Sequence, residues 1–252
     1  MRIDRLYRYP VKGLTAEALA DTEVEAGGCL PWDRAFALAQ GDAPFDPDNP
    51  QWLQKRNFMC LMANARIALL KSSFDPRSGR LAIQAPDGGS VAGNALLARD
   101  RERIGAWLAA FLGEEARGRP VLHYVPGHSF CDDRHKVVSL INLASIADLE
   151  RRVGAPRDPL RFRANIYFSR APAGVELDWV GRDLQVGGAR LRVTSRIVRC
   201  AATEVNPLTA ERDAKPVAEL RAAYGHADLG ILAEVIEGGR MALGDAIWLL
   251  PQ

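Results

Sequence analysis

The residue with the most distinctive chemical setting is Cys200, which follows an arginine in the segment R-C-A-A-T-E-V-N-P-L-T over 199–209. Positive charge beside a thiol favours the thiolate, and the thiolate is the form that attacks electrophiles or binds a soft metal. Most free cysteines are instead small buried apolar residues. The segment by itself therefore leaves both a reactive and a purely structural cysteine open.

The elements that must position this cysteine are mostly strands. Side chains alternate in character before Cys200, which predicts a strand that carries it to the strand's edge. Apolar residues at helical spacing predict three helices. We expect strands over 2–9, 17–25, 33–40, 65–74, 79–85, 183–187 and 190–200, helices over 100–112 (capped by Asp100), 143–153 (ended by Gly154) and 216–224, and a terminal hairpin turned at Gly238-Gly239.

Composition indicates a reducing compartment and excludes several partners. The four cysteines form no C-x-x-C pair, so neither a disulfide framework nor a zinc knuckle is expected. The N-terminus has no apolar leader, and no run approaches the ~18 apolar residues of a membrane span. A formal net charge of +2 is too small to indicate nucleic acid binding. We therefore expect a cytoplasmic protein with no membrane or nucleic acid partner.

The basic residues are nearly all arginine, with only five lysines among 33. Codon bias explains most of them as solvated surface charges, whereas a minority near Cys200 could line an anion site, since guanidinium binds phosphate and flat heteroaromatic edges bidentately. No dinucleotide turn, P-loop or H-E-x-x-H motif is present, so any redox chemistry needs electrons from outside. The run Asp132, Asp133, His135 is expected to be an exposed loop.

Five segments in order along the second half resemble the MOSC domain, the C-terminal module of molybdenum cofactor sulfurases. They are R-F-R-A-N-I, E-L-D-W-V-G, L-Q-V-G-G-A-R-L-R-V, R-C-A-A-T-E-V-N-P-L-T and A-L-G-D-A-I-W. Upstream, L-Y-R-Y-P-V-K-G, W-D-R-A-F-A-L-A and Q-K-R resemble the N-terminal β-barrel domain that accompanies MOSC in the mitochondrial amidoxime-reducing component and its bacterial relatives. The resemblance implies a β-rich α+β protein, with an N-terminal β-barrel domain over 1–125 and a MOSC β-barrel with flanking helices over 126–252.

The resemblance also implies a site for the molybdenum cofactor (molybdopterin) between the two domains. Cys200 would be the catalytic residue and the ligand of molybdenum, and the other cysteines (Cys29, Cys60, Cys131) would be structural. Ala164 replaces a common family proline, and Q-K-R at 54–56 replaces T-x-R. The residues expected to contact the cofactor are Lys12, Arg34, Arg56, Asn142, Ser145, Arg161, Arg163, Asn165 and Arg199, with Asn142 and Ser145 placed for the phosphate at a helix N-terminus.

The function implied is reduction of small N-hydroxylated compounds, such as amidoximes or hydroxylamines, with electrons from a separate iron–sulfur or haem protein. Two alternatives stay open. One is a sulfur carrier that bears a persulfide on Cys200. The other is a non-catalytic protein that binds or stores the cofactor. Pyridoxal phosphate is associated with the family only through an attached desulfurase domain, which this chain is expected to lack.

Overall fold

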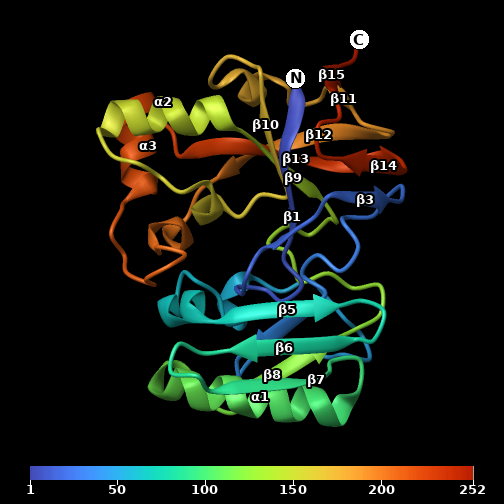
Figure 1. The fold of residues 1–252 in the computed structure, drawn as a ribbon, viewed down its shortest axis with the longest axis vertical. Coiled ribbons are helices and arrows are strands. Elements are labelled where there is room, and N and C mark those ends of the chain that lie inside the picture. Colours follow the sequence, from blue (N-terminus) through green and yellow to red (C-terminus); the bar gives the residue numbers. More distant parts are fainter. Residues whose placement is uncertain (252) are drawn as a thin grey trace.

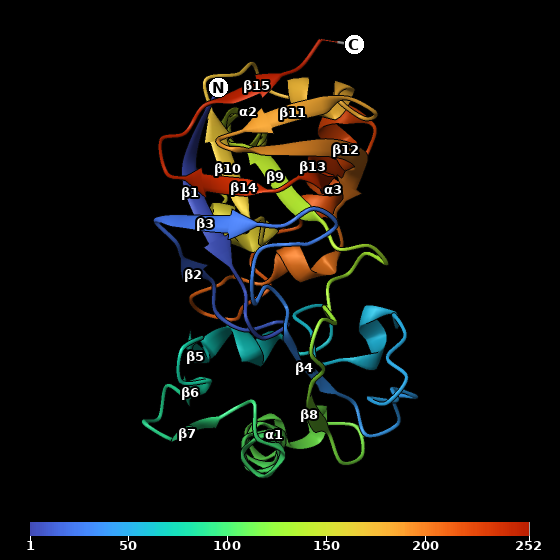
Figure 2. The ribbon, with the colours of Figure 1, turned by 90° about the vertical axis from the view of Figure 1, so that its right-hand side faces the viewer.

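The structure, a computed structural model, describes residues 1–251. Two units follow one another along the longest axis of the molecule (Figures 1 and 2). The larger unit carries both chain ends at its far end, and the smaller unit holds β5 to β8 and α1. The predicted β-rich α+β fold is confirmed.

An eight-stranded sheet forms the larger unit, in the order β15-β11-β12-β13-β9-β10-β1-β2. Most neighbours are antiparallel, and β9 and β10 are parallel. The alternation predicted before Cys200 is present in β12, where Leu191 and Val193 are buried and Arg192 and Thr194 are exposed. The strands are β1 (Arg2–Arg8), β2 (Glu17–Ala18), β9 (Val138–Asn142), β10 (Ile166–Ser169), β11 (Asp183–Val186), β12 (Ala189–Val198), β13 (Asp228–Glu237) and β15 (Ile247–Leu249).

This sheet curls until β1 approaches β15. The backbone N–H of Ile3 donates to the carbonyl of Asp245 at 2.9 Å, and that of Ile247 donates to the carbonyl of Met1 at 3.0 Å. These bonds satisfy backbone groups that an open sheet would leave at its edge. The curled sheet encloses the principal apolar core of the larger unit.

The first strands of the chain belong to the larger unit. Strand β1 pairs with β10, and β3 (Asp21–Val24) pairs with β14 (Gly239–Ala242). The beginning of the first half of the sequence therefore completes the sheet that the second half builds.

The smaller unit contains a three-stranded sheet, a two-stranded sheet and one long helix. Phe36, Leu81 and Ile104 are among the side chains that form its core. Figure 2 shows α1 at the end of the molecule, beside the strands of this unit. Its elements are β4 (Phe36–Ala39), β5 (Lys71–Asp75), β6 (Arg80–Gln84), β7 (Ser90–Asn94), β8 (Val121–Tyr124) and α1 (Ala98–Leu112).

Two helices lie side by side against the larger sheet, α2 (Leu143–Val153) and α3 (Pro216–Tyr224). The Asn142 side chain accepts from the N–H of Ala144 and so caps α2. Gly154 ends the helix at φ 70°, a left-handed conformation that glycine adopts without steric cost. Both helices match their predicted ranges.

Several local predictions were wrong. Residues 65–69 form a 3₁₀ helix before β5, because the carbonyls of Asn64 and Ile67 accept i+3 bonds instead of pairing with a strand. Helix α1 starts after Leu97, and Asp100 lies inside the first turn, where it accepts from the N–H of Asn94 at 2.8 Å.

The terminal hairpin does not form either. After Gly238-Gly239 the chain turns toward β3, which pairs with β14 in place of β13. A β-carbon on Gly239 would lie 2.3 Å from the carbonyl oxygen of Gly188, so this crossing requires glycine.

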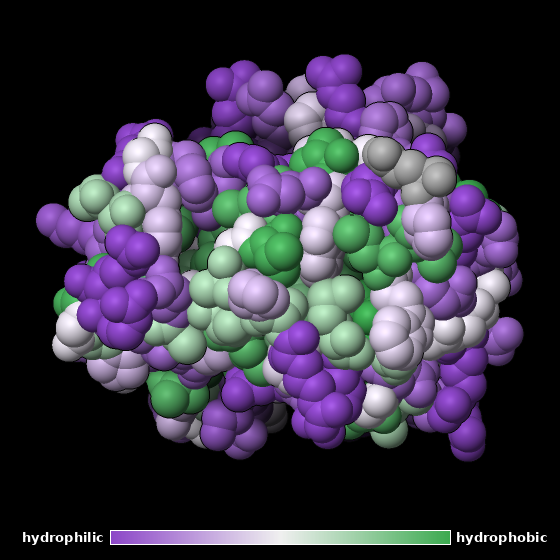
Figure 3. Space-filling view, turned by 90° about the horizontal axis from the view of Figure 1, so that it is seen from above, coloured by the Kyte–Doolittle hydropathy of each residue, from purple (hydrophilic) through white to green (hydrophobic). Residues whose placement is uncertain are grey.

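Apolar side chains gather at the end of the molecule that lies farthest from α1. Figure 3 looks onto this end and shows an apolar centre surrounded by hydrophilic residues.

Candidate functional site

A cavity of about 240 Å³ is lined by residues from both halves of the sequence. Its walls carry more basic than acidic side chains, and this excess makes the cavity favourable for an anion. The first half contributes Lys12, Arg34 and Lys55, and the second half contributes Arg161, Arg163, Asn165, Arg199 and Cys200.

Cys200 lies in the cavity wall just beyond the end of β12. The strand stops at Val198, and Cys200 precedes a 3₁₀ turn over Ala201–Glu204. The Thr203 hydroxyl donates to the carbonyl of Cys200 at 2.9 Å and fixes the turn. The thiol is partly exposed and belongs to no disulfide.

Lys55 supplies positive charge beside this thiol. Partial burial of the ammonium opposes its ionisation, but the negative charges of Asp132 and Cys200 outweigh burial and raise the pKa of Lys55.

Two arginines, the buried Arg199 and the half-buried Arg163, line the cavity without a carboxylate partner within residues 1–251. Arg199 is 8% exposed and donates to the carbonyls of Leu229 and Phe162, the latter at 2.9 Å. Arg163 has a φ of 52°, and its buried Nη2 makes no hydrogen bond. Burial lowers the pKa of each guanidinium to about 10. A buried charge without a counter-charge is costly, so these groups favour a bound anion.

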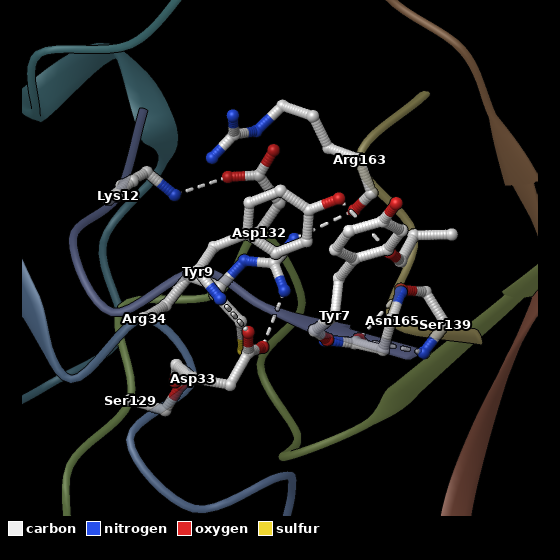
Figure 4. A network of polar contacts seen from close by, with 12 residues as sticks. Tyr7, Tyr9, Lys12, Asp33, Arg34, Ser129, Asp132, Ser139, Arg163 and Asn165 are labelled. Carbon is white, nitrogen blue, oxygen red and sulfur yellow. Dashed lines mark hydrogen bonds and ion pairs between the residues drawn. The ribbon is translucent and has the colours of Figure 1, made fainter. Parts of the chain in front are cut away.

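Tyr9 and Asp33 hold the arginines of the cavity in place. The guanidinium carbons of Arg34 and Arg163 each lie 4.3 Å from the centroid of the Tyr9 ring, as Figure 4 shows. Asp33 is 4% exposed, pairs with Arg34, and accepts from the N–H of Tyr9 at 2.8 Å. Arg34 also donates to the carbonyl of Arg163 at 2.9 Å, which joins the two halves of the sequence.

Lys12 and Lys55 converge on Asp132 across the cavity. The Lys12 ammonium donates to the carbonyl of Phe130 at 2.8 Å and to the Asp132 carboxylate. The Lys55 ammonium lies 3.8 Å from the other carboxylate oxygen. The loop of Asp132 is exposed, as the sequence predicts, but this side chain faces the cavity.

Asn165 and Arg161 line the cavity, but most of their polar side-chain atoms are paired with other residues of the protein. The Asn165 side-chain carbonyl accepts from the Ser139 hydroxyl at 2.8 Å, and its amide donates to the carbonyl of Tyr7 at 3.2 Å, so Asn165 ties together three strands. Arg161 pairs with Asp213 at 2.5 Å, and its buried Nε has no partner.

Three of the residues predicted to contact the cofactor do not line this cavity. Asn142 is fully buried as the cap of α2, and the Ser145 hydroxyl donates to Glu176 at 2.7 Å. Burial raises the pKa of the Glu176 carboxyl, and Ser145 and Glu176 border a separate pocket. Arg56 is exposed and borders a separate pocket.

Sequence reasoning missed several cavity residues, among them Lys55, Asp132, Cys60 and Cys131. Lys55 belongs to the same Q-K-R triplet as Arg56. The 3₁₀ turn over Lys55–Asn57 directs the Lys55 side chain, and not that of Arg56, toward the cavity. The two cysteines carry no local signal, because their place in the wall depends on the meeting of the two units. The binding roles of all these residues stay predictions.

Residues 1–251 contain neither a cluster of metal-binding side chains nor a membrane-spanning helix. No three His, Cys, Asp or Glu side chains come together where they could hold a metal ion. None of the helices in this range has the length and apolar character needed to cross a membrane.

Comparisons with known proteins place the chain in a family. The model of the MOSC domain matches residues 95–248, and that of the MOSC N-terminal beta barrel domain matches residues 1–115. The chain therefore belongs to the MOSC domain family and carries the N-terminal barrel domain as well. No curated protein matches the sequence.

Solved structures give remote matches. The YuaD protein from Bacillus subtilis is 15% identical, with a TM-score of 0.48, over 98% of this chain and 93% of that one. YiiM from Geobacillus stearothermophilus is 18% identical, with a TM-score of 0.35, over 45% of this chain and 54% of that one. YiiM from Escherichia coli is 17% identical, with a TM-score of 0.33, over 46% and 54%.

Proposed function

We propose that this chain binds the molybdenum cofactor in the cavity between its units and reduces small N-hydroxylated compounds with electrons from a separate iron–sulfur or haem protein. The observation that carries the proposal is a soft thiol, Cys200, in a wall shared with the half-buried Arg163 and the buried Arg199, neither of which pairs with a carboxylate within residues 1–251. The family supports the cofactor.

The residues of the cavity fit such a group. The orphaned Nη2 of Arg163 is a buried donor that needs an acceptor, and a phosphate or a pterin edge supplies one. Cys200 offers the sulfur donor that a molybdenum centre accepts as a ligand. Arg34, held by Asp33, would orient the anionic part of the group.

When bound, the cofactor supplies the two-electron redox chemistry that N–O reduction requires. The chain supplies ligation, orientation and positive charge. Because the six basic side chains of the cavity exceed its three acidic ones, its field also favours developing negative charge on a substrate.

Turnover with a chemical reductant tests the activity without the natural donor. Protein from a host that makes the cofactor should reduce an amidoxime or a hydroxylamine with a reduced viologen dye, and the Cys200→Ser variant should not. Cofactor-loaded protein that reduces none of these compounds would contradict the reductase and favour a storage role.

A second candidate function is transfer of sulfur as a persulfide on Cys200. It is favoured by the presence of a second thiol, Cys60, in the same cavity wall. Lys55 lies near both thiols, because Cys200 and Cys60 both influence the pKa of its ammonium group. Protein that gains cyanide-releasable sulfur on Cys200 and holds no molybdenum would support the carrier.

A further inference from the structure

Two aspartates of the cavity pair with its cations in different ways. Asp33 is 4% exposed and accepts from a backbone N–H as well as from Arg34, so it is a fixed part of the wall. The Asp132 side chain is 59% exposed, and within residues 1–251 its carboxylate bonds only to the ammonium groups of Lys12 and Lys55. Asp132 is thus a counter-ion that can leave.

Of the two cations that pair with Asp132, Lys12 cannot leave as easily. The Lys12 side chain is only 7% exposed, and the carbonyl of Phe130 holds its ammonium in place. Arg34 is close enough for its charge to lower the pKa of Asp132, alongside Lys12 and Lys55 and against the effect of burial. Figure 4 shows the Asp132 carboxylate turned toward the Lys12 ammonium.

We propose that Asp132 is an internal competitor that occupies the place of a ligand's phosphate group, and so sets how tightly the cavity binds phosphate. In the empty protein the carboxylate neutralises Lys12 and Lys55, which avoids the cost of an unpaired buried ammonium. A phosphate that enters must displace it, because the two anions repel each other at the same cations. Asp132 therefore lowers phosphate affinity and favours ligands with additional contacts.

The inference deepens the proposed function, because the phosphate would be that of the cofactor, but its test needs no molybdenum. Inorganic phosphate serves as the probe in calorimetric titrations of the full chain at low ionic strength. Asp132→Asn should bind phosphate roughly tenfold more tightly than wild type, because one opposing charge is removed at nearly constant volume. Asp133→Asn is the matched control, since Asp133 borders the same cavity but accepts from the N–H of His135.

A double variant identifies the cations. The gain of Asp132→Asn should disappear in Asp132→Asn combined with Lys12→Gln, and circular dichroism checks that each variant is folded. Unchanged or weaker binding by Asp132→Asn would overturn the inference, and so would an equal gain in Asp133→Asn, which would indicate a general change of field. These outcomes are independent of molybdenum content, so failure of the proposed function is recognised separately.

Discussion

Replacing Arg163 by methionine is expected to weaken cofactor binding without weakening the fold. Arg163 is a half-buried cation with no carboxylate partner within residues 1–251, and its buried Nη2 makes no hydrogen bond. A bound anion would gain that donor, and the empty protein gains little from it. The two properties should therefore respond differently to the substitution.

The magnitudes follow from the contacts of the guanidinium. A hydrogen bond to a charged group contributes about 1.5–3 kcal/mol, so cofactor affinity should fall roughly ten- to 150-fold. The empty protein loses a cation–π contact with Tyr9, worth roughly 0.5–2 kcal/mol, and regains roughly 0.3–1.5 kcal/mol from methionine against the same ring. It also loses the desolvation cost of the charge. Its free energy of unfolding should stay within about 1 kcal/mol of wild type, or rise.

Urea unfolding of the empty protein and molybdenum retention after gel filtration measure the two effects. Arg170→Met is the matched control, because Arg170 also has a positive φ, 66°, but is exposed and lies outside the cavity. The reasoning is refuted if Arg163→Met retains molybdenum like wild type, or if it lowers the unfolding free energy of the empty protein well beyond the control.

Three other perturbations have defined outcomes. Cys200→Ser should abolish reductase activity with an unchanged Tm, whereas Cys29→Ser should keep substantial activity. Activity in the Cys200→Ser variant would contradict the role of Cys200 as the molybdenum ligand. Hydrogen bonds from Arg192, with help from Arg190, lower the pKa of Asp183 to about 2. The ionised Asp183 therefore stabilises the fold above pH 3.8, the ordinary pKa of an aspartate, and this stabilisation is lost as the pH falls toward 2. In Asp183→Asn the urea midpoint should depend less on pH between those two values, and an unchanged dependence on pH would contradict this prediction. Arg212 donates hydrogen bonds to the carbonyls of Leu61, Met62 and Ala201 and so connects the two halves of the sequence. Arg212→Ala should therefore lower the free energy of unfolding by about 1–3 kcal/mol. A loss no larger than in the control Lys215→Ala would refute a stabilising role of these bonds.

The sequence predicted elements whose signal is local. Helix α2 has its Asn cap, its apolar face and its glycine stop within a few residues, and β12 has strict alternation, so both were found. The hairpin after Gly238 failed because its partner, β3, lies more than 200 residues away along the chain. Pairing across that distance leaves no mark in either segment.

The sequence predicted those residues of the candidate site that belong to recognisable motif segments. Cys200, Arg163 and Arg199 come from motif segments and do line one cavity. Asn142 and Ser145 were expected there because a helix end attracts anions, but both side chains donate to the buried Glu176 and neither lines this cavity. Lys55 and Asp132 depend on how a 3₁₀ turn and a loop from different parts of the chain meet, which no local pattern encodes.

The proposed boundary near residue 125 has a structural consequence. Strand β1 lies between β10 and β2, so a fragment that starts there would expose the edge of β10. Unpaired edges associate with other chains. Experiments on cofactor binding therefore need the full chain.

The central claim is that the cavity holds the molybdenum cofactor through Cys200. The most direct measurement is the molybdenum and pterin content of the full chain, purified from a host that makes the cofactor, beside Cys200→Ser prepared in parallel. The account predicts near-equimolar molybdenum and pterin in the wild-type protein and a clear loss of molybdenum in the variant. Wild-type protein without molybdenum or pterin, or a variant that holds as much molybdenum as wild type, would contradict it.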